Sequence, residues 1–335
     1  MSTLPVLSIS DLIVEFPTRR GVLRPVDRVG FDIARGEILG VVGESGAGKS
    51  MCGSAIVGLI DRPGRITGGE IRLSGERIDT LSQEKMRRIR GKRIGMVFQD
   101  PLTSLNPLMR VGDQIVETIR THLPVSEQEA RRRAIAALEE VGIPAASTRI
   151  DSYPHQFSGG MRQRVVIALA LAAEPELIIA DEPTTALDVS VQAQIMALLK
   201  RLCRDRGTAV MLITHDMGVI AESTDRVAVL YAGRLAEIGP TRDVLSSPRH
   251  PYTIGLMAST PSPTGGADRL SQIPGAMPNL RAIPPGCAFN PRCKKAFGPC
   301  TSELPVLKPV GRNEVACWLF DDALTGNPNK AEENA

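Results

Sequence analysis

"VVGESGAGKS", residues 41–50, runs from apolar residues into a glycine-rich turn that ends in a lysine and a serine. An apolar strand pattern, "EILGVV", leads into this turn, and a helix pattern, "KSMCGSAIVGLI", follows it. Residues 43–50 match the GxxxxGK(S/T) spacing of a P-loop, which binds the phosphates of a nucleoside triphosphate. The strand before and the helix after argue against a chance match. The loop alone does not distinguish a kinase, a switch, a motor or a pump.

Each residue type in this loop has a physical role in holding a triphosphate. Glycines let backbone N–H groups turn toward anionic oxygens without a Cβ clash, and the following helix adds the positive end of its dipole. Lys49 reaches the β- and γ-phosphates, and the Ser50 hydroxyl is a ligand for Mg²⁺. The predicted nucleotide-binding residues of the loop are Gly43, Glu44, Ser45, Gly46, Ala47, Gly48, Lys49 and Ser50.

The composition is that of a globular protein without a strongly charged surface. The 335 residues are 42% hydrophobic with a net charge of +3, which is too small for a strong field toward nucleic acid or an anionic membrane. Aromatic residues make up only 3%, which argues against a base-stacking nucleic-acid surface. No signal peptide is visible, and the longest apolar stretch, residues 165–173, is about half a membrane span. We expect a cytosolic chain that reaches a membrane only through protein partners.

The order of apolar patterns predicts an α/β core. Short strands are expected between residues 7 and 45, and two later helix patterns lead into the buried strands "ELIIADEP" and "TAVMLITHD". Repeated helix-then-strand units indicate a parallel sheet. Within the mostly helical stretch 110–150, Ser126 and Glu129 are expected to form a capping box, and Gly142 to end that helix. After about residue 247 the chain becomes rich in proline and glycine, as a linker or irregular appendage would be.

Two acidic residues end one of the apolar strands. Asp181 and Glu182 follow "LIIA", and α/β sheets bind ligands at the carboxyl ends of their strands. Asp181 is suited to orient the hydration shell of Mg²⁺, which leaves Glu182 to act as general base on the attacking water. A solvated pair of acids is the alternative. His215 and Gln99 end two other apolar strands, but taken alone they are most simply ordinary polar side chains.

A second small-residue turn enters a helix at "SGGMRQR", residues 158–164. Its free N–H groups and helix dipole make it a second candidate anion site. Taken alone, an ordinary serine N-cap followed by flexible glycines is the simpler interpretation. One phosphate chain does not easily need two such sites from one subunit. If the second turn binds a nucleotide, we expect that nucleotide to belong to another subunit's active site.

Together these motifs make the chain similar to the ATPase subunits of ABC transporters. "VFQD" resembles the Q-loop, "FSGGMRQR" the LSGGQ-type signature, "LIIADEP" Walker B, "TALD" the D-loop and "ITHD" the H-loop, in the family's order. Six ordered motifs, the P-loop included, are far more specific than one. The resemblance implies an α/β P-loop NTPase with a RecA-like core, an antiparallel β subdomain and a helical subdomain around residues 100–170. We expect this ATPase domain over residues 1–260, and a small irregular cysteine-containing extension over 261–335.

The resemblance also implies a head-to-tail dimer that sandwiches ATP between the P-loop of one subunit and the signature of the other. In that arrangement His215 senses the γ-phosphate, Gln99 links Mg²⁺ or the attacking water to the transmembrane subunits, and Phe16 stacks on adenine. Glu182, His215 and Gln99 are the implied catalytic residues, and Asp188 is the D-loop aspartate. The implied ligands of Mg²⁺ are Ser50, Gln99 and Asp181.

The signature departs from the family's general pattern at two positions. Phe157 and Met161 stand where Leu and Gln are usual. Met161 cannot supply the hydrogen bonds of glutamine, although Gln163 lies nearby. No glycine of either anion-binding turn is lost, so we expect a competent ATPase. The residues expected to contact a partner's nucleotide are Ser158, Gly159, Gly160, Met161 and Gln163.

Four stretches resemble the ATPases of dipeptide, oligopeptide and nickel importers: "DPLTSLNP", "YPHQFSGGMRQR", "DEPTTALDVSVQAQI" and "HPYTIGLMAS". That resemblance implies ATP-driven peptide import by two related but different ATPase subunits beneath two transmembrane permease subunits. A periplasmic or extracellular binding protein would deliver the cargo, and this chain would be peripheral on the cytoplasmic face of the inner membrane. A nickel or other small-solute importer is the alternative, followed by a soluble non-transport ABC ATPase. Such soluble proteins usually have two cassettes or a long coiled-coil insertion, neither of which is visible.

Four of the six cysteines lie near the end of the chain. Their spacing lacks the CxxC pairs of a typical zinc site, but four thiolates satisfy the ligand count of an iron–sulfur cluster. The basic side chains of Arg292, Lys294 and Lys295 would offset the charge of such a cluster. The peptide-importer resemblance suggests a 4Fe-4S cluster, with zinc or free buried thiols as alternatives. Cys52 and Cys203 fall on helices and are expected in the core. The implied cluster ligands are Cys287, Cys293, Cys300 and Cys317.

Overall fold

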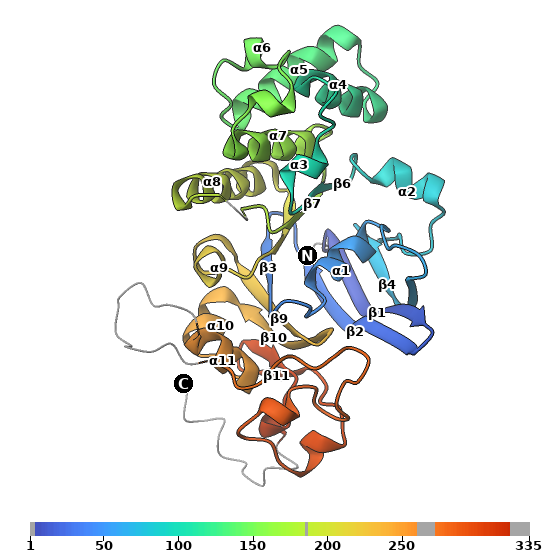
Figure 1. Cartoon of the computed structure of the whole chain (residues 1–335), viewed down its shortest axis with the longest axis vertical. Coiled ribbons are helices and arrows are strands. Elements are labelled where there is room, and N and C mark those ends of the chain that lie inside the picture. The colour runs from blue at the N-terminus through green and yellow to red at the C-terminus, as the bar shows by residue number, and fades with distance from the viewer. Residues whose placement is uncertain (1–3, 185–186, 260–271, 322–335) are drawn as a thin grey trace.

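The computed structural model describes residues 4–184, 187–259 and 272–321, which form two sheets with helices around them (Figure 1). The larger sheet has eight strands in the order β11-β12-β10-β9-β3-β8-β7-β6. Five consecutive strands, from β9 to the edge strand β6, run parallel, as the helix-then-strand pattern predicted. These strands are β9 (Arg226–Tyr231), β3 (Ile38–Val42), β8 (Ala209–Ile213), β7 (Leu177–Asp181) and β6 (Ile94–Val97).

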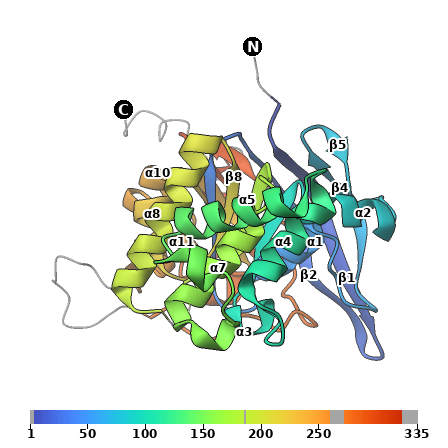
Figure 2. The ribbon, with the colours of Figure 1, turned by 90° about the horizontal axis from the view of Figure 1, so that it is seen from above.

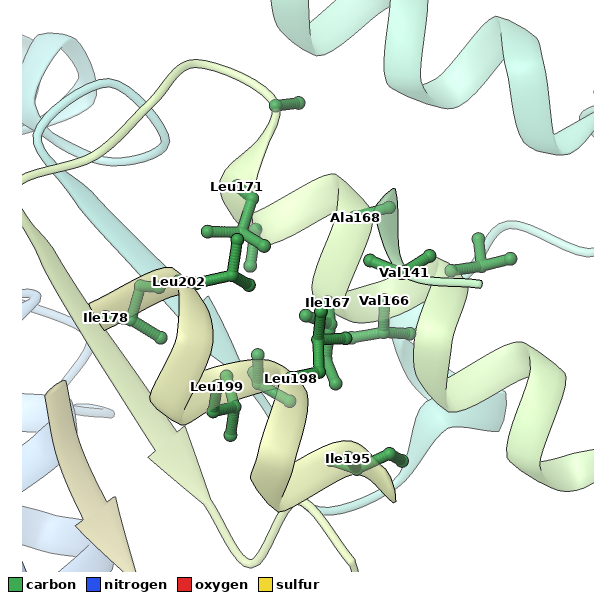
Figure 3. Close-up of a cluster of buried hydrophobic side chains, with 14 of the residues drawn as sticks. Val141, Val166, Ile167, Ala168, Leu171, Ile178, Ile195, Leu198, Leu199 and Leu202 are labelled. Carbon is green, nitrogen blue, oxygen red and sulfur yellow. The ribbon is translucent and has the colours of Figure 1, made fainter. Parts of the chain in front are cut away.

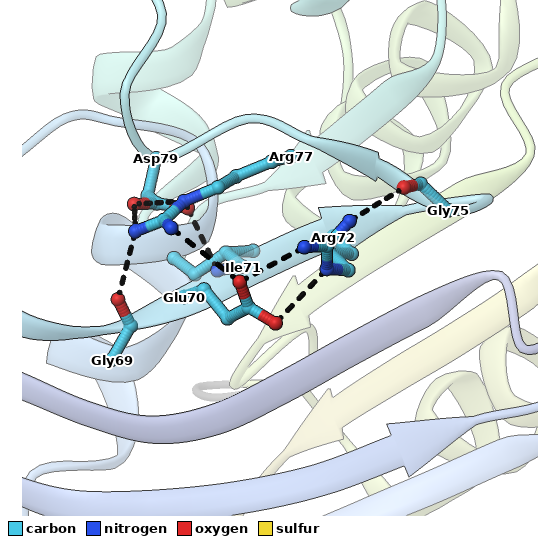
Figure 4. A network of polar contacts seen from close by, with 7 residues as sticks. All are labelled: Gly69, Glu70, Ile71, Arg72, Gly75, Arg77 and Asp79. Atoms are coloured by element: carbon cyan, nitrogen blue, oxygen red, sulfur yellow. Dashed lines mark hydrogen bonds and ion pairs between the residues drawn. The ribbon is translucent and has the colours of Figure 1, made fainter.

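The smaller sheet is antiparallel, with the order β2-β1-β4-β5. It contains β1 (Leu7–Thr18), β2 (Gly21–Ile33), β4 (Arg65–Leu73) and β5 (Glu76–Arg77). Charged side chains brace the β4–β5 hairpin (Figure 4). Arg72 donates to Glu70, Arg77 donates to Asp79, and the Asp79 carboxylate accepts the backbone N–H of Ile71 at 2.9 Å. The expected antiparallel β sheet is therefore present.

Helices occupy most of the stretch between residues 100 and 170, at one end of the molecule (Figure 1). Ser126 caps α5 as predicted, because its hydroxyl accepts the N–H of Glu129. The expected reciprocal capping-box bond is wrong, since the Glu129 carboxylate accepts from Arg132 and Arg133 instead. Gly142 follows the helix with φ of 75°. The elements of this stretch are α3 (Pro101–Ser104), α4 (Val111–His122), α5 (Glu127–Glu140), α6 (Ala146–Arg149), η1 (Pro154–Gln156) and α7 (Gly159–Leu171).

Aliphatic side chains of α7 and α8 (Val189–Arg206) pack together in one of the buried hydrophobic clusters. Figure 3 shows Ile167 and Leu171 of α7 facing Leu198 and Leu202 of α8, with Ile178 of β7 beside them. This packing fixes the helix that carries the "SGG" turn against the strand that carries the two acidic residues. Figure 2 shows β1, β2 and β4 on the opposite side of the molecule from α8.

The remaining helices flank the sheets and connect their strands. Helix α1 begins directly at the end of the P-loop, and α2 has Ser82 as its N-cap. Among the residues that the structure describes, no helix combines the length and hydropathy needed to cross a bilayer. These helices are α1 (Lys49–Ile56), α2 (Gln83–Ile89), α9 (Met217–Ser223), α10 (Thr241–Ser246) and α11 (Pro251–Ala258).

The C-terminal segment (residues 261–335) contains more regular structure in its described part than its composition indicated. Strand β10 (Arg234–Pro240) pairs antiparallel with β12 (Asn313–Val315), which pairs with β11 (Lys308–Val310). The expectation of an irregular extension over 261–335 is therefore wrong for these two strands, which extend the larger sheet. The rest of its described part contains only three short 3₁₀ turns: η2 (Asn290–Arg292), η3 (Gly298–Thr301) and η4 (Trp318–Phe320). The division of the chain near residue 260 stays a prediction.

Glu237 of β10 joins this segment to the core. Its side chain is completely buried, and its carboxylate accepts the backbone N–H groups of Arg249 and His250 at 3.0 and 2.9 Å. The same carboxylate accepts the side-chain amide of Asn313 in β12 at 2.8 Å. One buried acid thus supplies acceptors for the entry to α11 and for the added strand.

Replacing Glu237 by Ala should lower the free energy of unfolding by about 3 kcal/mol or more, because three donors, two of them in buried hydrogen bonds, lose their acceptor. Chemical denaturation of the full chain measures this change. Glu84→Ala is the matched control: the Glu84 side chain is 82% exposed and its contact with Arg88 is 3.7 Å long, so its effect should be within about 0.5 kcal/mol. Similar values for the two variants would contradict the role given to Glu237.

Candidate functional site

The carboxyl ends of four neighbouring parallel strands bring the predicted catalytic residues to one edge of the sheet. Strand β3 leads into the P-loop, and β6 ends two residues before Gln99. Strand β7 ends at Asp181, next to Glu182, and β8 ends two residues before His215. Because parallel strands point the same way, their ends share one edge. Motifs as much as 172 positions apart in sequence therefore meet in space, from Gly43 to His215.

The P-loop adopts a conformation that only glycine tolerates at two positions. Gly43 has φ of 151° and Gly48 has φ of 101°. A Cβ on Gly43 would lie 2.3 Å from the carbonyl oxygen of Leu230, and one on Gly48 would lie 2.1 Å from that of Pro25. The two glycines therefore let the loop turn tightly between the sheet and the β2 strand. Gly48 also serves as the N-cap of α1, so the loop ends at the positive end of a helix.

The side chain of Lys49, near the end of the P-loop, folds back onto the start of the loop. Its Nζ donates to the carbonyl oxygens of Gly43 at 2.8 Å and of Glu44 at 3.1 Å. Burial lowers the pKa of Lys49, and the charges of Glu182 and Asp181 act against that shift. The ammonium group is thus held at the loop, close to two carboxylates. This is a position from which it can reach phosphate oxygens bound by the loop.

Ser50 and Asp181 bring a hydroxyl oxygen and a carboxylate together. The Ser50 hydroxyl donates to Asp181 Oδ1 at 3.0 Å, and the Asp181 carboxylate is only 8% exposed. Burial raises the pKa of Asp181, the Ser50 hydrogen bond opposes the rise, and the charge of Glu182 adds to it. A divalent cation would relieve this accumulation of negative charge. Hydroxyl and carboxylate oxygens are the ligands that Mg²⁺ prefers, with phosphate and water completing its shell.

Gln99 and His215, whose roles the sequence alone left open, both contact the carboxylate of Glu182. Gln99 Nε2 donates to Glu182 Oε2 at 2.9 Å, and His215 Nδ1 lies 3.2 Å from Glu182 Oε1. The backbone N–H of Glu182 donates to Ile213 at 2.8 Å, and its φ is 48°. A non-glycine residue in this left-handed region is uncommon and is found at sites where the surroundings fix it. Gln99, Glu182 and His215 therefore form one polar group beside the Ser50–Asp181 pair.

The "SGG" turn lies at the start of α7, where Ser158 is the N-cap. Ser158 is exposed, and its hydroxyl accepts the N–H of Met161 at 3.3 Å. Gly159 has no atom within 4 Å of the place a Cβ would take. Gln163, by contrast, is 2% exposed. This burial gives no support to the predicted contact between the Gln163 side chain and a partner's nucleotide.

Two further predicted residues have clear local roles. Asp188 caps α8, where its carboxylate accepts from Val191 N and from the Ser190 hydroxyl, and that hydroxyl holds the pKa of Asp188 below its usual range. The adjacent residues 185–186 of "TALD" lie outside the described residues. Phe16 lies in β1, half-buried, with its ring against Gly64. Its stacking on adenine stays a prediction.

The four C-terminal cysteines converge on one small cavity, whose lining includes all of them together with Phe289. All four are free thiols, and the N–H of Cys287 donates to the carbonyl of Cys300 at 3.0 Å. Burial raises the pKa of Cys287, of Cys293 and, to about 12, of Cys317. Across the described residues, however, no group of three or more His, Cys, Asp or Glu side chains is arranged to hold a metal ion. Cys52 and Cys203 are buried in the core as predicted.

Sequence reasoning did not predict the contacts that Arg292 of the C-terminal segment and Tyr252 of α11 make with the P-loop. Arg292, expected to offset the charge of a cluster, donates to the carboxylate of Glu44 at 2.9 Å. The backbone N–H of Glu44 donates to the hydroxyl of Tyr252 at 2.9 Å. No spacing or periodicity in the sequence links these residues, because 248 positions separate Glu44 from Arg292.

Comparison with known proteins places the chain among transport ATPases. The family model described as "ABC transporter" matches residues 26–185, and the one described as "Oligopeptide/dipeptide transporter, C-terminal region" matches residues 236–300. The oligopeptide transport ATP-binding protein OppD of Bacillus subtilis (strain 168) is 48% identical over 318 residues, which cover 94% of this chain and 89% of that protein. The dipeptide transport ATP-binding protein DppD of Escherichia coli (strain K12) is 43% identical over 320 residues, 95% of this chain and 98% of that protein.

Solved structures give the same fold. An ATP-binding cassette in a dimeric post-hydrolysis state bound to ADP and Pi matches with a TM-score of 0.64 and 29% identity, over 70% of this chain and 99% of that chain. The part of this chain that such a cassette covers agrees with the expected P-loop NTPase fold. The chain therefore belongs to the family of ABC transporter ATP-binding proteins, in the branch that contains the oligopeptide and dipeptide transporters.

Proposed function

We propose that this chain binds ATP at Gly43–Ser50 and hydrolyses it to drive the import of peptides. The observation that carries the proposal is the position of Glu182, held by Gln99 and His215 beside the Ser50–Asp181 pair. The relatives named as peptide-transport ATP-binding proteins, similar over nearly the whole chain, support peptides as the cargo. A nickel or other small-solute importer is the second candidate.

In the proposed reaction each residue acts from the position it has in the structure. The N–H groups of the loop and Lys49 Nζ bind the phosphates, and Ser50 with Asp181 would hold Mg²⁺, which would supply positive charge to the phosphate oxygens. A carboxylate oxygen of Glu182 accepts a proton from the water that attacks the γ-phosphorus. Gln99 and His215 orient that carboxylate, and we assign to Gln99 the further role of contacting Mg²⁺ or the water. ADP and inorganic phosphate are the products.

We propose that the second half of the site comes from another ATPase subunit, through the turn formed by Ser158, Gly159 and Gly160. Two permease subunits and, indirectly, a substrate-binding protein complete the transporter. The chain would then lie peripherally on the cytoplasmic face of the cell membrane. Reconstitution of the chain with its permease subunits tests the function, and ATP-dependent uptake of di- and oligopeptides is expected. Uptake of nickel chelates but of no peptide would favour the second candidate.

Glu182→Gln should reduce ATP turnover by about 10²–10⁴-fold, the usual contribution of a general base, while ATP binding persists. An ATP-bound dimer should therefore accumulate. Turnover is measured by phosphate release, and the dimer by gel filtration with ATP. Glu139→Gln, on the exposed face of α5, is the matched control and should behave as the unmodified protein. Unchanged turnover in Glu182→Gln would show that another group activates the water.

Gly159→Glu should slow ATP hydrolysis without changing ATP binding by the monomer. Space is open where its side chain begins, and a carboxylate in the first turn of α7 favours the helix, so the protein should fold. The new charge would repel a partner's γ-phosphate across the dimer. We expect unchanged ATP binding by the monomer but about 100-fold slower hydrolysis. Gly159→Ala is the neutral control, and equal hydrolysis by the two variants would contradict a composite site.

We further propose that Cys287, Cys293, Cys300 and Cys317 hold a 4Fe-4S cluster. Their convergence on one cavity supports this, because the donor set fits in kind and number. The thiols are not arranged as a metal site in this structure, so binding would require deprotonation and inward movement of the side chains. Zinc is the alternative for the same four ligands.

Anaerobic purification should therefore yield a brown protein with about four irons per chain, by the stoichiometry of the cluster, and replacing Cys300 by Ser should remove them. Iron and zinc assays with a visible absorbance scan make the measurement. Cys203→Ser, in the core of α8, is the control and should retain the metal. A colourless, iron-free protein with four reactive thiols would refute the cluster, and zinc instead of iron would establish the alternative.

A further inference from the structure

The C-terminal segment touches the P-loop at a charged side chain of the loop itself. Glu44 is the second residue of the loop, and its carboxylate accepts from Arg292 Nη1 at 2.9 Å. The Arg292 side chain is 8% exposed and that of Glu44 is 26% exposed. Neither group of this ion pair belongs to the reacting set of Lys49, Asp181 and Glu182. The pair is well shielded from solvent, so its interaction is stronger than that of a surface salt bridge.

Arg292 is fixed from several directions, which makes it a rigid partner. Its Nε donates to the carbonyl oxygen of Pro274 at 2.8 Å, and its Nη1 also reaches the hydroxyl of Tyr231 at 3.3 Å. The centre of its guanidinium group lies 5.8 Å from the ring of Tyr231 and 5.9 Å from that of Phe289. Such cation–π contacts and hydrogen bonds leave the guanidinium little freedom to turn away from Glu44.

Two further contacts hold the loop from the same side. The N–H of Glu44 donates to the hydroxyl of Tyr252, whose side chain is completely buried. Tyr252 packs on Tyr231 with ring centres 4.6 Å apart. The methyl group of Met277 lies 2.9 Å from the place a Cβ on Gly46 would take. The loop is thus contacted at Glu44 and Gly46 by residues that follow β9 in the chain.

The negative charge of Glu44 explains why the contact with Arg292 is needed. A carboxylate in a loop that binds a triphosphate repels the ligand, and the repulsion is largest where solvent is excluded. The guanidinium neutralises this charge and draws the side chain toward the C-terminal segment. It therefore removes a penalty on anion binding and holds the backbone N–H groups of the loop in place.

We propose that Arg292 is a positioning residue of the nucleotide site, which acts through Glu44 to keep the P-loop competent for ATP. The inference rests on the proposed function, because it assumes that the loop binds ATP. Arg292 directly precedes Cys293, one of the four cysteines around the cavity. The C-terminal segment is therefore a structural part of the ATP site rather than an independent appendage.

A double-mutant cycle on the full chain tests the proposal, with a fluorescent ATP analogue titrated in the presence of Mg²⁺. R292M should weaken binding by about tenfold, within the range of coupling between two sites, because it leaves the Glu44 carboxylate unpaired. E44Q/R292M should recover most of the affinity, because no uncompensated charge remains. R312M is the matched control: Arg312 lies in the same segment, 76% exposed and paired with Asp243, and its replacement should leave binding unchanged.

Equal affinities of R292M and the unmodified chain would overturn the proposal. So would an equal loss when R292M is introduced into the unmodified chain and into the E44Q variant. A lower melting temperature alone would show a purely structural role. If R292M does not fold, R292Q, which keeps amide donors but loses the charge, carries the same comparison. K49A separates the two hypotheses: if it binds ATP as tightly as the unmodified chain, the proposed function fails, whatever R292M does.

Discussion

The parallel register of β3, β8 and β7 is the constraint on which the site depends. Asp181 pairs with Ile213, and Ile213 pairs with Val41, at the ends of the three strands. Because side chains alternate between the faces of a sheet, a slip of one residue would turn Asp181 away from Ser50. The strands are completely buried, so their apolar side chains fix the register through packing on both faces. The geometry of the reacting groups is thus a consequence of aliphatic packing along the strands that lead to them.

Much of this arrangement follows from local sequence patterns. The continuous apolar runs that end in "DE", "THD" and "FQD" predicted parallel strands, and the topology then requires their polar ends to lie together. Gln163 is different, because its predicted contact with a partner's nucleotide stays a prediction and its side chain is buried. The buried residues of α7 lie on all sides of the helix, so no one-sided apolar pattern in the sequence indicated that Gln163 would be buried.

The features that the sequence did not predict depend on contacts between distant segments. Strands β11 and β12 have three residues each, too few for a periodic pattern, and they form because β10 offers them an edge. Glu237 lies within an apolar strand pattern, and its acceptors are satisfied by residues 12 to 76 positions away. An acid at a buried strand position is acceptable only when such donors are present, and nothing local in the sequence shows that they are.

The same reasoning explains why the ATP site extends beyond the part of the chain that carries its motifs. A phosphate-binding loop needs N–H groups that are already oriented, because disorder in the loop must be removed when the ligand binds. Here the glycines that allow the loop its shape also make it intrinsically flexible, so the order has to come from neighbours. The sheet supplies it at Gly43 and β2 supplies it at Gly48. The loop is also contacted by Tyr252 of α11 and, from the C-terminal segment, by Met277 and Arg292, so the C-terminal segment adds contacts to those that the ATPase domain provides.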